Sequence, residues 1–246
     1  MLTKKIVLLL AVLLPAPAFA AAGGAPLDKA NTDIHNQASL QRGARNFVNY
    51  CLGCHSAQYM RWNRVAADLG IPEDVLVREL MITGGSPHDT MRTAMPADLG
   101  ETWFGKAPPD LSLIARSRGT DYLYTFLRSY YADPSRPNGV NNTVLVGTAM
   151  PHVLAHLQGV RQPRYELREV DGRTEQVLVG FDAGTPGELS EAEYDEFVRD
   201  TVNFLDYVGE PVKAKRERMG VWVVLFLLMF WVFAWLLKRE YWKDVK

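Results

Sequence analysis

The sequence predicts a mainly α-helical fold with a β-hairpin and one C-terminal transmembrane helix. Three observations support this: apolar residues recur at helical spacing in several segments, a short turn separates two strand-like segments, and residues 219–237 contain no charged side chain. The 246 residues allow one or two domains. With 48% hydrophobic and 22% charged residues the chain is not disordered, and its 19 glycines and two cysteines exclude a collagen-like repeat and a disulfide-rich scaffold.

Residues 1–20 have the three-part pattern of a secretory signal peptide. Lys4 and Lys5 precede an apolar run over 6–14, and small residues occupy the −3 and −1 positions of a cleavage site after Ala20. An N-terminal membrane anchor is the alternative, but the apolar run is too short to span a bilayer. We therefore expect cleavage after Ala20 and export of residues 21–209.

The first helix of the exported part is expected over residues 40–51. Ser39 is the expected N-cap, and Gly43 lies where it would permit the close approach of a second helix. The apolar residues that recur at helical spacing in this segment are Leu40, Ala44, Phe47, Val48 and Cys51.

The two cysteines of the chain lie in the run Cys51-Leu52-Gly53-Cys54-His55. Two cysteines three positions apart and followed directly by histidine are typical of covalent haem c attachment, in which the histidine is the proximal iron ligand. A disulfide, a thioredoxin-type redox pair and a zinc site are alternatives, but a zinc site needs two further ligands and the sequence has no second cysteine pair. The motif therefore predicts one haem c held by both thiols.

Two further helices are expected over 72–82 and 120–131. Pro72 occupies the first position of one, and Gly84 and Gly85 follow its end. The other is rich in aromatic and apolar residues, which are more often core than electron relays: Tyr122, Tyr124, Phe126, Leu127 and Tyr130.

A proline-rich turn at Pro108 and Pro109 precedes a short helix expected over 111–118. Asp110 is its expected N-cap and Gly119 its end. A carbonyl in this turn could accept a bond from the ring N–H of a haem-ligating histidine, as such histidines usually require. Two arginines, Arg116 and Arg118, lie at the end of this helix. Their guanidinium groups match the geometry of a haem propionate.

A sixth iron ligand is needed for pure electron transfer, whereas an open position would bind small molecules. Met95 and Met150 lie in identical Thr-Ala-Met-Pro settings, and the sequence does not separate them. Methionine sulfur favours ferrous iron and raises the potential, whereas a second histidine would lower it. The rival histidines are His35, His88, His152 and His156.

The segment that follows is expected to contain a loop and a hairpin. Residues 133–142 are rich in turn formers and predict a loop. Residues 165–170 and 173–179 flank Asp171-Gly172, which is a β-hairpin signal.

The last helix of the exported part is predicted to begin with a capping box, in which Ser190 and Glu193 satisfy each other's backbone donors. Its apolar face is expected to pack against the helix over 40–51 through Tyr194, Phe197, Val198, Thr201, Leu205 and Val208. The acidic residues of its first turn could help dock a basic partner, although the helix dipole favours them there in any case.

Residues 219–237 are long enough to cross a hydrocarbon core of about 30 Å. Segment 210–218 is a basic juxtamembrane segment, and 238–246 is expected to form a cytoplasmic tail. The net charge of −1 is the sum of +2 in the signal segment, −7 in residues 21–209 and +4 in residues 210–246. This distribution gives an acidic exported domain on a basic membrane stalk, and it does not favour a nucleic-acid partner.

These motifs together resemble the cytochrome c1 family of the quinol–cytochrome c reductase (cytochrome bc1) complex. The haem motif alone is shared by all c-type cytochromes, but its order with the later motifs and a single C-terminal anchor is more specific. The segments that carry the resemblance are Arg42-Gly43, 51–56, 108–112, Arg118, Asp121-Tyr122, 202–205, Glu210-Pro211 and 218–220.

The resemblance implies a c-type cytochrome domain with long insertions and a role for each matching residue. Cys51 and Cys54 would hold the haem, and His55 would be its proximal ligand. Met150 would be the sixth ligand, because the family's ligand methionine follows the Pro-Pro-Asp-Leu turn, and Met95 would be structural. The carbonyl of Pro109 would orient the histidine, Arg118 would pair with a propionate, and Tyr122 would line the haem pocket.

The resemblance also implies a function and partners. The protein would carry electrons from a Rieske iron–sulfur protein to a soluble or membrane-bound c-type cytochrome, and its anchor would pack on a cytochrome b subunit. It would be an electron-transfer subunit that is not catalytic alone. The haem domain would lie in the periplasm and the C-terminus in the cytoplasm of a bacterium, with one pass through the inner membrane.

Two other functions compete with this interpretation. One is a membrane-anchored haem enzyme or gas sensor with a five-coordinate iron. The other is a thiol–disulfide oxidoreductase without haem.

Overall fold

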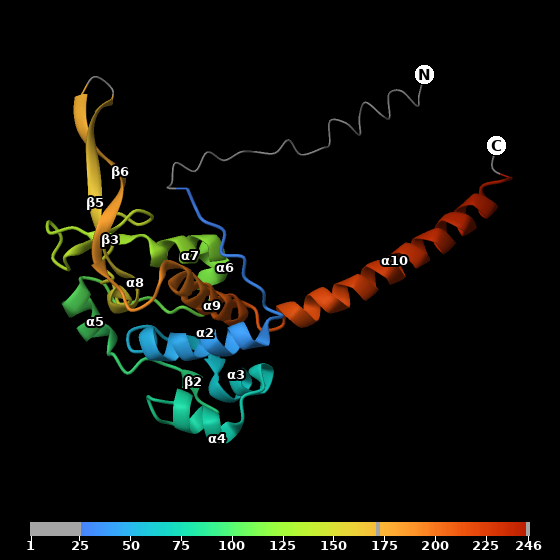
Figure 1. The fold of residues 1–246 in the computed structure, drawn as a ribbon. Helices are drawn as coiled ribbons and strands as arrows, with labels where there is room; N and C mark the ends of the chain where they lie inside the picture. Colours follow the sequence, from blue (N-terminus) through green and yellow to red (C-terminus); the bar gives the residue numbers. More distant parts are fainter. Residues whose placement is uncertain (1–25, 171–172, 245–246) are drawn as a thin grey trace.

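The computed structural model describes residues 26–170 and 173–244. It has a helical head from which a long hairpin and a long C-terminal helix project in different directions (Figure 1). The helices are α2 (Gln37–Tyr50), α3 (Trp62–Leu69), α4 (Glu73–Val75), the π-helical turn η1 (Leu76–Leu80), α5 (Ala97–Phe104), α6 (Ile114–Arg118), α7 (Thr120–Arg128), α8 (Ala155–Gln158), α9 (Glu191–Gly209) and α10 (Lys213–Tyr241). The strands form three antiparallel pairs: β1 (Ala57–Arg61) with β2 (Thr90–Met91), β3 (Tyr130–Ala132) with β4 (Val140–Asn142), and β5 (Gly159–Val170) with β6 (Arg173–Pro186). The expected mainly helical fold with a hairpin and an apolar C-terminal helix is confirmed.

The core of the head is built on the contact between α2 and α9, as expected. Gly43 of α2 faces the backbone of Asp200 and the side chain of Phe204, so closely that a Cβ atom would lie 2.8 Å from the Phe204 Cβ. The rings of Phe47 and Phe204 pack at 5.6 Å. Because any side chain would separate the helices, the glycine sets how closely they pack.

Polar side chains bridge the same helix pair. The buried Ser39 hydroxyl donates to Asp200 at 2.6 Å, and Arg42 Nε donates to the same carboxylate at 2.5 Å. The N-cap of α2 is Asn36, whose Oδ1 accepts the Ser39 N–H, so the expectation that Ser39 is the cap was wrong. Ser39 lies inside the helix because its hydroxyl is the partner of a buried carboxylate on α9.

Helix α9 begins with the predicted capping box. Ser190 accepts from the Glu193 N–H, and the Glu193 carboxylate accepts from the Ser190 N–H at 2.9 Å. Five of the six residues expected on its apolar face are buried: Tyr194, Val198, Thr201, Leu205 and Val208. Phe197 is partly buried against the same core.

Several expected boundaries differ in the structure. The helix expected over 72–82 begins after Pro72 and changes to π-helical geometry at Leu76. The helix expected over 111–118 begins at Ile114, because Asp110 forms a turn with Ser112 instead of capping it; Gly119 ends this helix as expected.

The helix expected over 120–131 ends at Arg128, and residues 130–132 form β3. The segment 133–142 is not entirely loop, because residues 140–142 pair with β3 as β4. The predicted hairpin is present but longer, since β5 begins at Gly159 and β6 ends at Pro186; its expected turn at Asp171-Gly172 lies outside the described residues.

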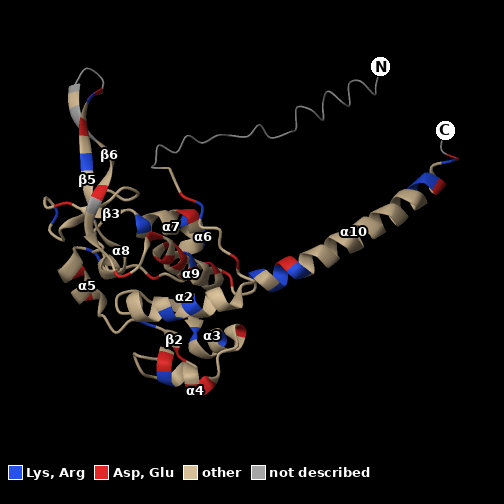
Figure 2. Cartoon of the chain, viewed as in Figure 1, with Lys and Arg blue, Asp and Glu red and all other residues tan. Residues whose placement is uncertain are grey.

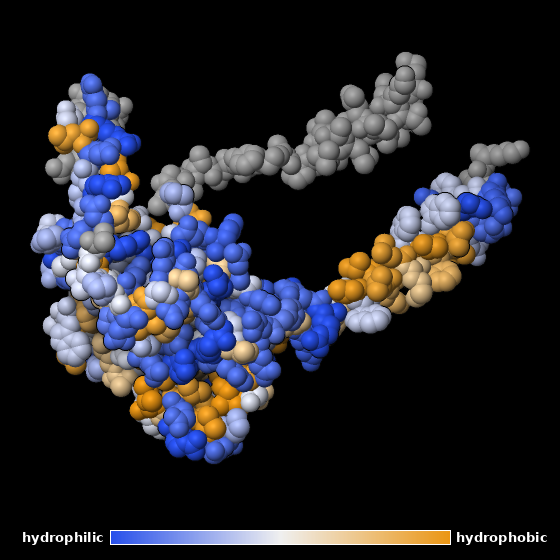
Figure 3. Space-filling model, in the orientation of Figure 1, coloured by the Kyte–Doolittle hydropathy of each residue, from blue (hydrophilic) through white to orange (hydrophobic). Residues whose placement is uncertain are grey.

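Helix α10 contains the segment 219–237 and continues at both ends. Its large apolar side chains from Met219 to Leu237 are exposed, and none is buried within the described structure. Figure 3 shows this apolar surface bounded by hydrophilic ends, and Figure 2 shows lysine and arginine at both ends of the uncharged stretch. At about 1.5 Å per residue the helix is long enough to cross a bilayer.

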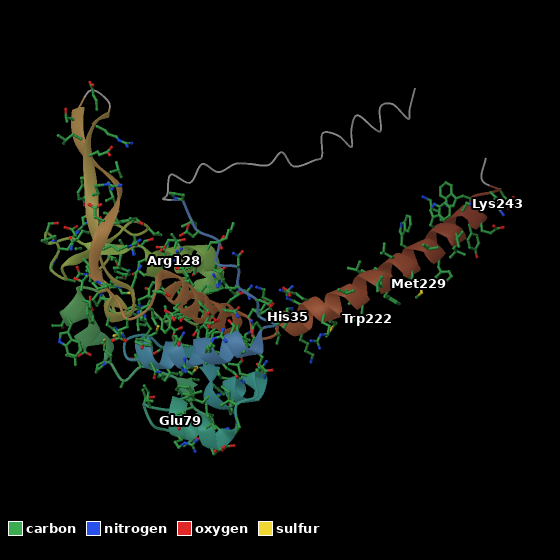
Figure 4. All side chains as sticks on the ribbon, viewed as in Figure 1. His35, Glu79, Arg128, Trp222, Met229 and Lys243 are labelled. Atoms are coloured by element: carbon green, nitrogen blue, oxygen red, sulfur yellow. The ribbon has the colours of Figure 1, made fainter. Side chains whose placement is uncertain are left out.

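Ion pairs connect the start of α10 to the head. Lys213 Nζ lies 2.8 Å from Asp206, and Arg216 Nε lies 2.6 Å from Glu210. His35 lies beside the first turns of α10 (Figure 4), where its Nε2 is 3.5 Å from Glu217. Helix α10 therefore begins at a defined junction with α9.

Candidate haem-binding site

The Cys51–His55 run forms a tight turn at the C-terminal end of α2. The backbone N–H groups of Cys54 and His55 both donate to the Cys51 carbonyl, at 3.0 and 2.8 Å. Leu52 is fully buried and fixes the turn to the core, whereas both cysteines are partly exposed. The two thiols and the imidazole are therefore presented by one short turn.

The imidazole of His55 is oriented by the proline-rich turn. Its Nδ1 lies 2.7 Å from the carbonyl oxygen of Pro109, which can only accept a hydrogen bond. Nδ1 therefore carries the proton, and Nε2 keeps a free lone pair. Burial lowers the pKa of His55, more than the bond to Pro109 and the charge of Asp110 raise it, which favours the neutral ring. A neutral imidazole with an unprotonated Nε2 is the form that binds iron.

The turn that holds His55 is itself hydrogen-bonded to the segment after the haem motif. The Leu111 N–H donates to the Ser56 carbonyl at 2.8 Å. Asp110 accepts from the Gln58 N–H at 2.9 Å, and the buried Ser112 hydroxyl accepts from the Tyr59 N–H at 3.1 Å. These bonds hold the Pro109 carbonyl beside the His55 imidazole.

A cavity of about 260 Å³ lies beside this turn. It is bounded by one haem-motif cysteine, by the first of the two methionine motifs and by the proline-rich turn, and its lining includes Cys54, Ser56, Thr93, Met95, Pro108 and Asp110.

The two Thr-Ala-Met-Pro motifs adopt the same local turn. The Met95 N–H donates to the Thr93 hydroxyl at 3.1 Å, and the Met150 N–H donates to the Thr148 hydroxyl at 3.3 Å. Their surroundings differ, which local sequence alone does not reveal.

Met95 lies near the proline-rich turn. The Thr93 hydroxyl donates to the Gly53 carbonyl at 2.7 Å, which ties this motif to the haem-motif turn. A Cβ atom on Gly100 would lie 3.3 Å from the Met95 sulfur and 2.8 Å from Pro108. The sulfur is thus close to Pro108, next to the residue that binds Nδ1 of His55.

Met150 lies in different surroundings, against β3. Its carbonyl accepts from the Tyr130 hydroxyl at 3.2 Å. The imidazole of His152 stacks on the Tyr130 ring with the centroids 4.7 Å apart and the planes 2° from parallel. The Met150 segment is therefore attached to β3 through one buried tyrosine.

An aromatic row connects this tyrosine with the other residues proposed to face the haem. Tyr122 stacks on Phe126 at 6.2 Å, and Phe126 meets Tyr130 edge-on at 5.4 Å. The Arg118 guanidinium lies 5.5 Å from the centre of the Tyr122 ring. Tyr122 and Phe126 are four residues apart on one face of α7, and Phe126 contacts Tyr130 at the start of β3. A chain of contacts therefore runs from Arg118 through these three rings to the tyrosine that binds the Met150 carbonyl.

The surroundings of the two cysteines disfavour the thiolate form that a redox pair needs. Burial, with a smaller contribution from the neighbouring Cys54, raises the pKa of Cys51 to about 12, and burial also raises the pKa of Cys54. Reactive cysteine pairs need a lowered pKa to form thiolate. In the described chain no three His, Cys, Asp or Glu side chains are grouped as a metal site would require. The spacing of the two cysteines and the oriented imidazole fit haem c.

Sequence reasoning missed two contributions to this site. The backbone bonds made by Asp110 and Ser112 replace the capping role expected for Asp110. Tyr130 was assigned to the core of a helix, although the spacing of Tyr122, Phe126 and Tyr130 could have indicated an aromatic face.

Comparisons with known proteins agree with this site. Residues 28–245 match the model of the Cytochrome C1 family. The chain is 48% identical to the cytochrome c1 of Allochromatium vinosum, over 98% of this chain and 99% of the relative. It is 46% identical to a protein of Nitrosomonas europaea named ammonia monooxygenase gamma subunit, over 97% of each. It is 29% identical to the cytochrome c1 of Rhodospirillum rubrum, over 86% and 84%. With its haem-motif turn and oriented histidine, the chain belongs to the cytochrome c1 family, whose cofactor is haem c.

Proposed function

We propose that the protein is a membrane-anchored electron carrier that receives electrons from a Rieske iron–sulfur protein and passes them to a c-type cytochrome. Membership of the family supports its assignment as the haem subunit of a quinol–cytochrome c reductase complex. The observation that carries the proposal is the bond between His55 Nδ1 and the Pro109 carbonyl, which leaves Nε2 free for iron. Bound haem supplies an iron that alternates between ferrous and ferric states.

In this proposal Cys51 and Cys54 would hold the haem through thioether bonds, and His55 and Met150 would bind its iron. Nε2 of His55 would bind the haem iron, and the sulfur of one methionine would be the second protein ligand. The order of the motifs along the chain supports this choice between the two methionines. Met150 follows the Pro-Pro-Asp-Leu turn, as the ligand methionine of the family does, whereas Met95 precedes it.

The remaining site residues have supporting roles in the proposal. Pro109 fixes the imidazole, and Arg118 neutralises a propionate from its position over Tyr122. The contacting rings of Tyr122, Phe126 and Tyr130 would form one wall of the pocket. In this proposal the protein acts by holding and orienting the cofactor, and none of these side chains carries out a proton transfer.

The exposed apolar surface of α10 supports a single-pass anchor in the inner membrane of a bacterium. With the signal pattern of residues 1–20, it supports a haem domain in the periplasm and a cytoplasmic C-terminus. The anchor would contact cytochrome b. The charge of −7 on residues 21–209 favours a basic electron acceptor at low salt.

The donor can be tested in membranes that contain the full-length protein. Adding a quinol should reduce its haem, as followed by absorption, and membranes from a strain that lacks the Rieske protein should show no such reduction. Reduction at the same rate without the Rieske protein would contradict the proposed donor. Chemical reduction with dithionite serves as the control that the haem is present in both membranes.

A further inference from the structure

Tyr130 is buried, with 1% of its surface exposed, although its hydroxyl is polar. That hydroxyl donates to the Met150 carbonyl at 3.2 Å and also faces the Thr148 side chain. The ring is parallel to the imidazole of His152 at 4.7 Å. One side chain therefore contacts residues on both sides of Pro151 as well as the backbone of Met150.

Several elements fix Tyr130 itself. As the first residue of β3 it pairs with Asn142 of β4. Its carbonyl accepts from the Arg161 guanidinium of β5 at 3.3 Å, and its ring meets Phe126 of α7 at 5.4 Å. The segment 143–154, in contrast, contains no helix or strand. A rigid side chain thus holds an irregular segment in place.

We propose that Tyr130 is a positioning residue that holds Met150 in its ligating position. This inference rests on the proposed role of Met150 as an axial ligand. Tyr130 touches the backbone of Met150 and the ring of His152, so it acts through the segment and not on the iron. An irregular segment that loses such a bond spends more time with its methionine withdrawn.

The consequence is measurable because an external ligand such as carbon monoxide binds only when methionine is withdrawn. The apparent affinity for that ligand is proportional to the fraction of protein in the open form. A typical intramolecular hydrogen bond changes such an equilibrium about fivefold. Weaker methionine ligation also lowers the midpoint potential, since methionine sulfur favours ferrous iron.

The test uses Tyr130→Phe in the full-length holoprotein, which keeps the ring and its stacking but removes the hydroxyl. The affinity of the ferrous protein for carbon monoxide should rise about fivefold. The midpoint potential should fall, and the charge-transfer band of the ferric iron–methionine bond should weaken. Tyr131→Phe is the matched control, because Tyr131 is the next residue of β3, is also buried, and packs on Phe181 of the hairpin.

Met150→Leu, measured in parallel, separates this inference from the ligand assignment. Met150→Leu should let carbon monoxide bind the iron. If it does, but Tyr130→Phe has the same carbon monoxide affinity and midpoint potential as Tyr131→Phe, the inference is wrong and the ligand assignment stands. A lower melting temperature for Tyr130→Phe with no change in affinity shows a merely structural role and also overturns it. If Met150→Leu does not bind carbon monoxide more readily than the unmodified protein, both the ligand assignment and the role of Tyr130 are wrong.

Discussion

Met150→Leu should convert the haem to a high-spin, carbon monoxide-binding form with a lower midpoint potential. Leucine is close to methionine in volume and is apolar, so the segment after β4 should still fold. What is lost is the sulfur, the only side-chain atom of Met150 that can ligate iron. The absorption spectrum, the potential and the rate of carbon monoxide binding each report this loss.

Met95→Leu is the matched control, because the two methionines lie in the same Thr-Ala-Met-Pro turn. It should leave the spectrum low-spin and the potential unchanged, since the Met95 sulfur packs near Pro108 and Gly100. A high-spin spectrum in Met95→Leu with a normal one in Met150→Leu would reassign the ligand.

Gly43→Ala should destabilise the haem domain by about 3 kcal/mol, the upper part of the range for overpacking. Alanine is the better helix former by about 1 kcal/mol, so propensity alone predicts stabilisation. The methyl group, however, would lie 2.8 Å from the Phe204 Cβ and closer still to the Asp200 carbonyl oxygen. Because a backbone atom cannot rotate away, α2 and α9 must separate.

This loss should lower the melting temperature of the purified full-length protein in detergent by roughly 6–12 °C, as followed by circular dichroism. Gly220→Ala is the control, because a Cβ atom at this α10 glycine has no neighbour within 4 Å. Equal melting temperatures for the two variants would show that α2 and α9 do not depend on this close contact.

Features encoded by adjacent residues could be predicted from the sequence. The capping box of Ser190 and Glu193, the end of a helix at Gly119 and the hairpin around residues 171–172 each depend on a few neighbouring side chains. The Cys51–His55 motif is also local, because covalent attachment requires that spacing.

Features decided by distant residues could not be predicted in this way. Asn36 and Ser39 are both good N-cap residues. Asn36 is the N-cap, whereas the Ser39 hydroxyl binds Asp200 of α9. Its local sequence would allow Asp110 to cap a helix. Its carboxylate instead accepts a hydrogen bond from the Gln58 N–H of β1.

The two methionine motifs show the same limit at the site. Their local turns are equivalent, and only tertiary neighbours distinguish them, namely Pro108 for Met95 and Tyr130 for Met150. The role proposed for Tyr130 depends on a contact across twenty residues.

The central claim, an electron carrier with two protein ligands on one covalently bound haem c, is tested most directly by one spectrum of the purified full-length protein. The reduced protein should show a sharp low-spin c-type band that carbon monoxide does not rapidly change, and the haem should stay attached after denaturation. A high-spin spectrum with fast carbon monoxide binding would contradict the electron-carrier function and favour a five-coordinate enzyme or sensor.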